Sequence, residues 1–415
     1  MDSIIAAAAR ALAGGDPLGA LDRVALRDDP DAVALRGIAM AQLGDLGRAR
    51  ELLHAAARDY EDRQPLAHAR CALAMAEVAL AARDLTSVDA DVHAAVARLE
   101  DDGDWLNAAH GRLLLARRAV LLGLLPEAET ELDQLAGLAS AMERPEAAPT
   151  IWIRIEATAS LLRAEIAVRR VQARRARDAF ASARASARRA GVSSLCREVD
   201  VAEQELQKVA ARREVEGSTQ DLRLEDVEAL MSAPILIADA CRRGLSSPRA
   251  AVSLASRPVL WKIARLLCES WPQATSRDVL RSEALEAKAA NEAWRTRLRV
   301  EVGRLRKALS PIATIESADG GYLICPLGVE EVAVLLVPED SDFGELRALL
   351  ADGQAWSTSS LALALGMSQR NVQRLLAELE ADGRVRSAGK GRAKRWLAGT
   401  ALASTTAMLL PRFDP

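Results

Sequence analysis

The stretch from Trp294 to Leu309, WRTRLRVEVGRLRKAL, constrains the fold of this chain more than any other. Its apolar residues recur at spacings of three and four, which places them on one side of an α-helix. The opposite side is cationic and has few acidic residues that could neutralise it by i,i+4 pairing. The pattern predicts a helix that packs on a core with one face and binds a polyanion with the other. A solvated helix with scattered arginines is the alternative. The apolar stripe is Trp294, Leu298, Val302, Leu305 and Leu309, and the opposite face is Thr296, Arg297, Arg299, Val300, Gly303, Arg304 and Lys307.

The composition favours tightly packed helices over sheet. Half of the residues are hydrophobic but only 3% are aromatic, and a length of 415 residues allows about two to four domains. The net charge is −3, so any affinity for nucleic acid must come from local basic patches rather than from the chain as a whole.

The cysteines and the N-terminus indicate a reduced, soluble protein of the cytoplasm. The five cysteines are widely spaced and form no CxxC pair, so neither a disulfide framework nor a zinc site is expected. The N-terminus begins with Asp2 after Met1 and lacks the positive region of a secretory signal. No stretch approaches the ~20 apolar residues that span a bilayer.

Residues 1–215 have helical periodicity, interrupted at intervals by Gly-Asp, Arg-Asp and Pro. In the segment from Ala32 to Tyr60, a break at Gly44 is followed by small residues such as Ala49 and Ala56. This pattern resembles the tetratricopeptide helix-turn-helix, although its breaks lie about forty residues apart rather than the family's ~34. The resemblance implies an α-solenoid of stacked helical hairpins that serves for dimerisation or binds a peptide or protein effector.

Two other features of this region have both a functional and a structural interpretation. The basic run from Arg169 to Arg189 offers phosphate contacts, but such runs are more often a solvated face. The four histidines lack metal-ligand spacing, and packing or surface roles are favoured over metal binding. No phosphate-binding loop, nucleophile elbow or Cys/His pairing supports an enzyme, and no cofactor is expected.

Residues 225–328 contain short strands, three helices and a terminal hairpin, after a polar segment at 214–224 that we expect to be a linker. Pro258 opens the first helix, Thr275 or Ser276 caps the second, and the basic helix is the third. The order of VSLASRPVLWKIARLL, LRVEVGRLRKAL and Gly321-Tyr322 resembles the winged helix of OmpR/PhoB response regulators. The resemblance covers about residues 235–326.

In that family the third helix lies in the major groove of DNA. The resemblance implies that Val300 and Arg304 face bases, and that Arg299, Arg306 and Lys307 meet bases or backbone. The chain departs from the pattern at the wing, where Ala318 and Asp319 stand in place of a minor-groove arginine, and it has no receiver domain.

Residues 338–398 predict a second winged helix. The segment STSSLALALGMSQRNVQRLLAELEADGRV resembles the helix-turn-helix of MarR- and IclR-like regulators, with Gly366 in the turn and Ser368 as the cap of the reading helix. A basic wing, RVRSAGKGRAKRWLA, follows and suits phosphate or minor-groove contact. Protein contact is the alternative role, and no function is expected for the tail at 399–415. The predicted contacts of this domain are Ser368, Gln369, Arg370, Asn371, Gln373 and Arg374 on the helix and Lys390, Arg392, Lys394 and Arg395 in the wing.

The sequence therefore predicts a mostly α protein, with an N-terminal α-solenoid of helical hairpins followed by two α+β winged-helix domains. The expected function is sequence-specific binding of double-stranded DNA by a homodimeric transcriptional regulator. The alternative is an adaptor, in which the solenoid binds a partner protein and the winged helices are interaction modules.

Overall fold

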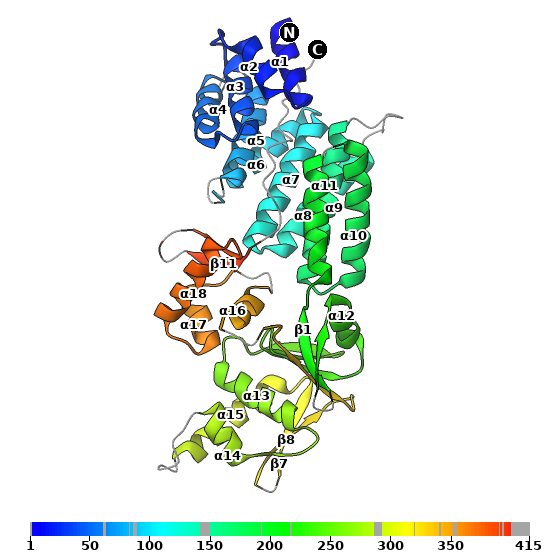
Figure 1. Ribbon diagram of the computed structural model, residues 1–415, viewed down its shortest axis with the longest axis vertical. Coiled ribbons are helices and arrows are strands. Elements are labelled where there is room, and N and C mark those ends of the chain that lie inside the picture. The colour runs from blue at the N-terminus through cyan, green and yellow to red at the C-terminus, as the bar shows by residue number, and fades with distance from the viewer. Residues whose placement is uncertain are drawn as a thin grey trace.

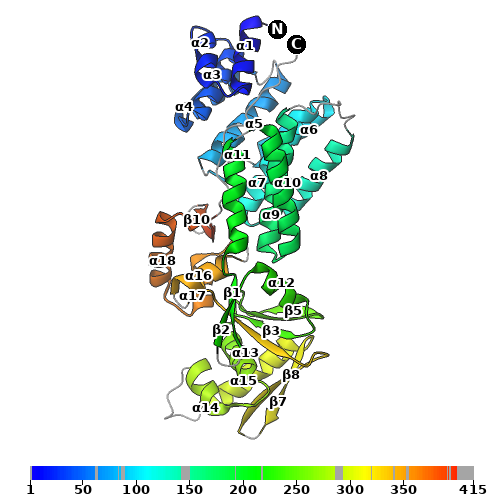
Figure 2. The same cartoon turned by 45° about the vertical axis from the view of Figure 1, so that its right-hand side comes forward.

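The computed structural model describes residues 2–399, except 61–63, 83, 86–88, 142–149, 192, 216–217, 286–292, 319, 340–341, 352–354, 390 and 392–393. The protein is mostly helical, with a helical N-terminal region followed by α+β parts, as the sequence predicts. Figures 1 and 2 show an elongated molecule with the helical region at one end and the basic helix α15 near the other. The predicted tail lies almost entirely outside the described residues.

The helical region is built of antiparallel helix pairs, as its periodicity predicts. Gly44 (φ +88°) lies in the turn between α3 and α4, and Gly123 (φ +75°) ends α7 in the left-handed conformation that glycine adopts without strain. Ala49 and Ala56 are fully buried, and a Cβ at Gly37 would lie 2.8 Å from Leu53 Cγ, so these pairs need small residues at their contacts. The helices are α1 (Ser3–Ala13), α2 (Pro17–Val24), α3 (Pro30–Gln42), α4 (Leu46–Tyr60), α5 (Pro65–Ala81), α6 (Asp89–Asp101), α7 (Trp105–Leu122), α8 (Leu125–Ala141), α9 (Thr150–Arg169), α10 (Ala173–Ala190) and α11 (Ser193–Glu203), followed by the 3₁₀ turn η1 (Gln204–Gln207).

The expected linker is a β-hairpin, so that prediction is wrong. Strands β1 (Ala211–Val215) and β2 (Ser218–Leu222) pair with each other, and β1 also pairs with β9 (Val332–Leu336). Helix α12 (Leu224–Ser232) and strands β3 (Leu236–Asp239), β4 (Gly244–Ser247) and β5 (Ala250–Ser253) follow. The sheet order is β2-β1-β9-β3-β4-β5, antiparallel except between β3 and β9. The polar sequence of β2 reflects a strand whose side chains are mostly exposed.

The first winged helix continues from this sheet. Pro258 begins α13 (Pro258–Ser270), and the side chain of Ser276 caps α14 (Arg277–Val279) by accepting a hydrogen bond from Val279 N, as the sequence predicts. A π-helical turn η2 (Leu280–Ala284), α15 (Ala293–Leu309) and the hairpin β7 (Ala313–Ala318)–β8 (Gly321–Pro326) complete it, with β6 (Thr275–Ser276) along β8.

The second winged helix is a smaller unit with its own core. It consists of α16 (Asp342–Leu350), α17 (Thr358–Leu365), α18 (Gln369–Ala381) and the hairpin β10 (Val385–Ala388)–β11 (Arg395–Ala398). Trp396 is buried and bonds through its indole Nε1 to Thr358 Oγ1 at 2.9 Å, which fixes the hairpin against α17. Figures 1 and 2 both show this unit beside the junction between the helical region and the sheet.

No helix in the described part of the chain is both long and apolar enough to cross a membrane.

Candidate nucleic-acid interface

Helix α15 has the two faces that its sequence predicts. Leu298, Val302, Leu305 and Leu309 are at most 1% exposed and belong to the core that α13 and the β7–β8 hairpin share. Trp294 is only partly buried, with the guanidinium carbons of Arg281 and Arg295 at 5.4 and 5.5 Å from its ring centroid. The buried stripe therefore fixes which residues of α15 face solvent.

The opposite face of α15 is exposed along its whole length. Val300, an apolar residue, is 48% exposed at its centre. The side chain of Arg304 is 64% exposed, and its NH1 atom lies 2.9 Å from Glu301 Oε1. Because an exposed ion pair contributes only about 0–1 kcal/mol, it leaves the guanidinium available to a stronger anion. The other predicted contacts that are exposed on this face are Arg297, Arg299, Gly303 and Lys307.

Arg306, also a predicted DNA contact, is engaged within the winged helix. Its Nε donates to the carbonyl oxygen of Ile315 at 2.7 Å, and its guanidinium carbon lies 6.0 Å from the ring centroid of Tyr322. A Cβ at Gly321 would collide with the carbonyl of Thr275, which explains the glycine of the Gly321-Tyr322 motif. Arg306 therefore holds the β7–β8 hairpin against α15. At the tip of this wing, Ala318 is described, and Asp319 lies outside the described residues.

The bounds of α18, the helix that the sequence predicts to read DNA, are set by local signals that the sequence contains. Gly366 ends α17 in the left-handed conformation (φ +70°), and the hydroxyl of Ser368 accepts a hydrogen bond from Asn371 N at 3.2 Å. This is the N-cap geometry that favours serine. Val372, Leu375, Leu376 and Leu379 are buried as predicted, and the predicted contacts Gln369, Arg370, Gln373 and Arg374 are exposed.

The polar face of α18 is less cationic than that of α15. Arg374 donates to Glu378 at 2.8 Å and to Asn371 Oδ1 at 3.1 Å, and Glu380 lies further along the same helix. The hydroxyl of Ser368 is occupied by the cap. The charge of Arg374 is therefore shared with an acidic side chain of its own helix.

The basic wing of the second winged helix is only partly described. Lys394 Nζ lies 4.1 Å from the ring centroid of Trp396, and Lys394 and Arg395 are both half-buried. Lys390 and Arg392 lie outside the described residues. Arg386 at the base of the wing donates to the carbonyl oxygen of Leu121 at the end of α7, in the helical region. The sequence has no signal for this contact because the partner is a backbone atom far away in the chain.

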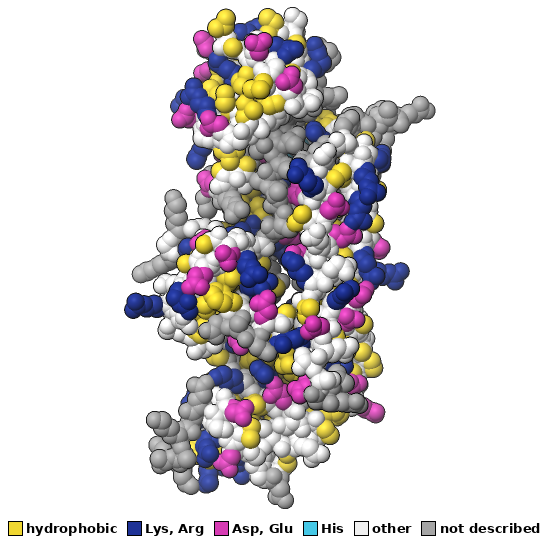
Figure 3. Space-filling model, viewed as in Figure 1, with side chains coloured by type: hydrophobic (Ala, Val, Ile, Leu, Met, Phe, Trp, Pro, Cys, Tyr) yellow, Lys and Arg dark blue, Asp and Glu magenta, His cyan; other side chains and the backbone are white. Residues whose placement is uncertain are grey.

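Several arginines of the basic run at residues 169–189 pair with acidic side chains. Arg170 pairs with Glu129 at 2.6 Å, and Arg169 with Glu165 at 2.5 Å. Arg184 pairs with Glu203. On the face drawn in Figure 3, basic and acidic side chains are interspersed over the helical region. These pairs favour the structural interpretation of the run.

The described residues contain no group of three or more His, Cys, Asp or Glu that could hold a metal ion.

Burial raises the pKa of the Cys71, Cys241 and Cys268 thiols to about 12, so these thiols stay protonated and unreactive at neutral pH. His110 is buried with its Nε2 at 3.1 Å from Glu77 Oε2, between α5 and α7.

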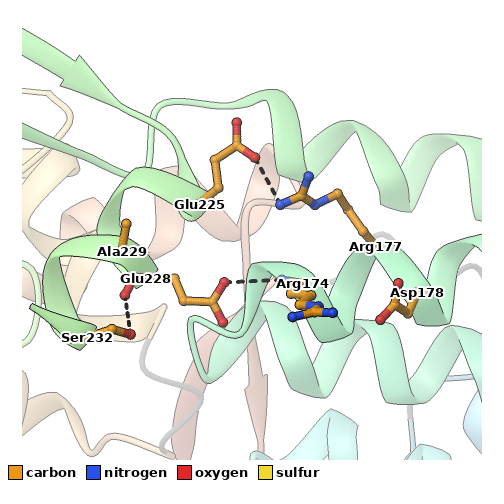
Figure 4. A pocket seen from close by; sticks show the side chains of 7 residues that line it. All are labelled: Arg174, Arg177, Asp178, Glu225, Glu228, Ala229 and Ser232. Carbon is orange, nitrogen blue, oxygen red and sulfur yellow. Dashed lines mark hydrogen bonds and ion pairs between the residues drawn. The ribbon is translucent and has the colours of Figure 1, made fainter.

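An open pocket of about 560 Å³ lies between α10 and α12 (Figure 4). Arg177 pairs there with Glu225 at 3.1 Å, and Glu228 Oε2 accepts a hydrogen bond from Arg174 N at 3.2 Å. These contacts join the helical region to the sheet, and the pocket holds no pairing of a nucleophile with a base.

Comparison with known proteins identifies no family for this chain. No family model matches the chain, and no curated protein matches it.

Proposed function

We propose that this protein is a sequence-specific transcriptional regulator that binds double-stranded DNA through its two winged helices. Helix α15 is the principal reading helix and α18 the second. The helical region serves for dimerisation or for sensing a peptide or protein effector, and the protein acts as a homodimer in the cytoplasm.

One observation carries the proposal: a 17-residue helix, α15, presents a mostly cationic exposed face while Leu298, Val302, Leu305 and Leu309 on its other face are buried in a core. The guanidinium fork of arginine matches the O6 and N7 acceptors of guanine in the major groove, which admits an α-helix. Arg297, Arg299 and Lys307 are exposed on the same helix and supply further cations for contact with phosphates.

The test is a gel shift on duplexes selected from a random library, at two salt concentrations. If the helices neutralise about six phosphates, the affinity is expected to fall on the order of 10³-fold between about 50 and about 200 mM salt. Absent binding, or an affinity that salt leaves unchanged, contradicts the proposal.

Replacing Gly303 by alanine is expected to stabilise the protein and weaken its DNA binding. A Cβ at this position would meet no atom of the protein within 4 Å, yet glycine inside a helix costs about 0.5–1 kcal/mol relative to alanine. The added methyl group would hold the backbone away from DNA. Thermal unfolding and gel shift measure the two effects.

Gly137→Ala is the matched control for this substitution. Gly137 is also an exposed glycine within a helix, α8, with no atom within 4 Å of its Cβ position. It should give the same gain in stability with unchanged binding. Equal affinity of the Gly303→Ala variant and the wild type would show that DNA does not approach this position closely.

The homodimer is expected because twofold symmetric operators require two copies of each reading helix. Light scattering at micromolar concentration should therefore give twice the mass of the 44.5 kDa chain. A monomer mass at that concentration would contradict this part of the proposal.

A second candidate is the adaptor, in which the winged helices bind protein. The observation in its favour is the second winged helix, where Arg374 is paired with Glu378 and Arg386 contacts the helical region. If the protein captures a protein partner and no duplex is selected in the gel-shift experiment, the adaptor function is favoured.

A further inference from the structure

The chain has three parts: the helical region, the sheet with the first winged helix, and the second winged helix. Each of these parts contacts the other two. The first contact joins the helical region to the sheet. Glu228 of α12 accepts a hydrogen bond from the backbone N of Arg174 in the first turn of α10, and Glu225 pairs with Arg177 (Figure 4). An acidic side chain at a helix N-terminus satisfies a backbone donor that has no partner within the helix.

The second contact joins the two winged helices through Arg243, at the start of β4. Arg243 is 8% exposed, and its guanidinium donates to the carbonyl oxygen of Ala364 at the end of α17 and to Glu345 Oε2 of α16, the latter at 2.6 Å. Burying a guanidinium is costly unless its donors are satisfied, and at this interface Ala364 and Glu345 supply acceptors for two of its nitrogens. Trp261 of α13 lines the same small cavity as Arg243 and Glu345.

The third contact joins the second winged helix to the helical region. Arg386 of β10 donates to the carbonyl oxygen of Leu121. This carbonyl belongs to the last turn of α7, where carbonyls lack i+4 partners within the helix and cations are favoured. Ala388, two residues after Arg386, packs against the apolar cluster of α5, α6 and α7 that includes Leu121.

These contacts close a ring, because each part is held by both of the others. We propose that the ring makes the two reading helices one rigid unit, which recognises a composite duplex site whose two halves have a fixed separation. The helical region contacts both of the other parts and so fixes their relative position. The inference rests on the proposed function, because it assumes that both winged helices bind duplex DNA.

The test inserts base pairs between the two halves of a selected site. Five base pairs turn one half by about half a helical turn relative to the other. The wild type should then lose most of the ~10²–10⁴-fold gain in affinity that joining two binding modules provides. In the Arg386→Ala variant the ring is open, so the same insertion should cost at least ~10-fold less.

Arg58→Ala is the matched control for the insertion experiment. Arg58 is exposed on α4 and belongs to neither winged helix, so its loss changes the charge equally and leaves the ring closed. Its spacing dependence should equal that of the wild type. Three results would overturn the proposal. The first is a wild-type affinity that does not change with the insertion, and the second is a footprint that covers only one half of the site. The third is an affinity that depends on the insertion equally in the Arg386→Ala variant and the wild type.

Hydrogen exchange without DNA separates a failure of this inference from a failure of the proposed function. Arg386→Ala should weaken the protection of α7's last turn and also that of α16 and α17, around the distant Arg243 contact. Faster exchange near Arg386 alone would mean that the ring does not act as a unit. Reversal of the exchange pattern by Arg386→Lys, which restores a cation, would show that the contact and not misfolding is responsible.

Discussion

Arg304→Ala is expected to lower the affinity for the selected duplex by ~5- to 150-fold, the equivalent of ~1–3 kcal/mol for one bidentate arginine–guanine contact. Because the Arg304 side chain is 64% exposed and pairs with Glu301 of the same helix, the midpoint of thermal unfolding should be nearly unchanged. Specificity should relax at one base pair of the site. Gel shift on the selected duplex and on its single-base variants measures both effects.

Arg58→Ala is the control, since Arg58 is an exposed arginine on α4 in the helical region and its loss changes the net charge equally. It should bind as the wild type does. Arg374→Ala should also weaken binding, but less, because Arg374 shares its charge with Glu378. Wild-type affinity of both the Arg304→Ala and the Arg374→Ala variants would remove the assignment of α15 and α18 as reading helices.

The second large effect concerns stability and pH, and it centres on Glu198 of α11. Its side chain is 3% exposed, and Arg117 NH2 lies 3.4 Å from its Oε1. Burial raises the pKa of Glu198 to about 7; Arg117 opposes this rise and the neighbouring Glu165 adds to it. The folded state therefore holds this proton more tightly than the unfolded chain does, whose carboxyl has a pKa near 4.5.

The sign of the pH dependence follows from this difference. A carboxyl whose pKa is higher in the folded state makes the protein lose stability as pH rises from the unfolded pKa to the folded one. A rise from 4.5 to about 7 corresponds to a loss of up to about 3 kcal/mol between pH 5 and pH 8. Glu198→Gln has no proton to lose and should not show this loss.

Urea unfolding of the wild type and the Glu198→Gln variant at pH 5, 6, 7 and 8 measures the effect. The variant should gain stability relative to the wild type as the pH rises, with the steepest change midway between the two pKa values, at about pH 5.5 to 6. Parallel stability curves over this range would mean that Glu198 ionises in the folded protein as freely as in the unfolded chain.

The elements of both winged helices could be predicted because their signals are local. The spacing of Leu298, Val302 and Leu305 determines which face of α15 is buried, and the cap of Ser368 with the left-handed Gly366 determines where α17 ends and α18 begins. Each signal lies within a few residues of the structure it specifies. Helices α15 and α18 could therefore be placed without knowledge of any contact between distant residues.

The hairpin β1–β2 could not be predicted in this way. The residues of β2 are polar and exposed up to the buried Leu222, and those of β1 are mostly charged. β1 becomes a strand of the sheet by pairing with β9, where Arg212 lies opposite Leu336. A strand whose side chains face solvent has no apolar alternation, because its stability comes from backbone pairing with another segment.

The sequence by itself determined the helical pairs, the buried stripes of α15 and α18, and the cationic character of both winged helices, since periodicity, caps and charge are properties of neighbouring residues. Only the tertiary structure decided which cations remain free. Arg386 is held by a carbonyl 265 residues away, Arg243 by one 121 residues away, and Arg306 by the hairpin that it supports. Every residue has a backbone carbonyl, so a sequence cannot mark the one that an arginine will bind; the packing of the three parts selects it.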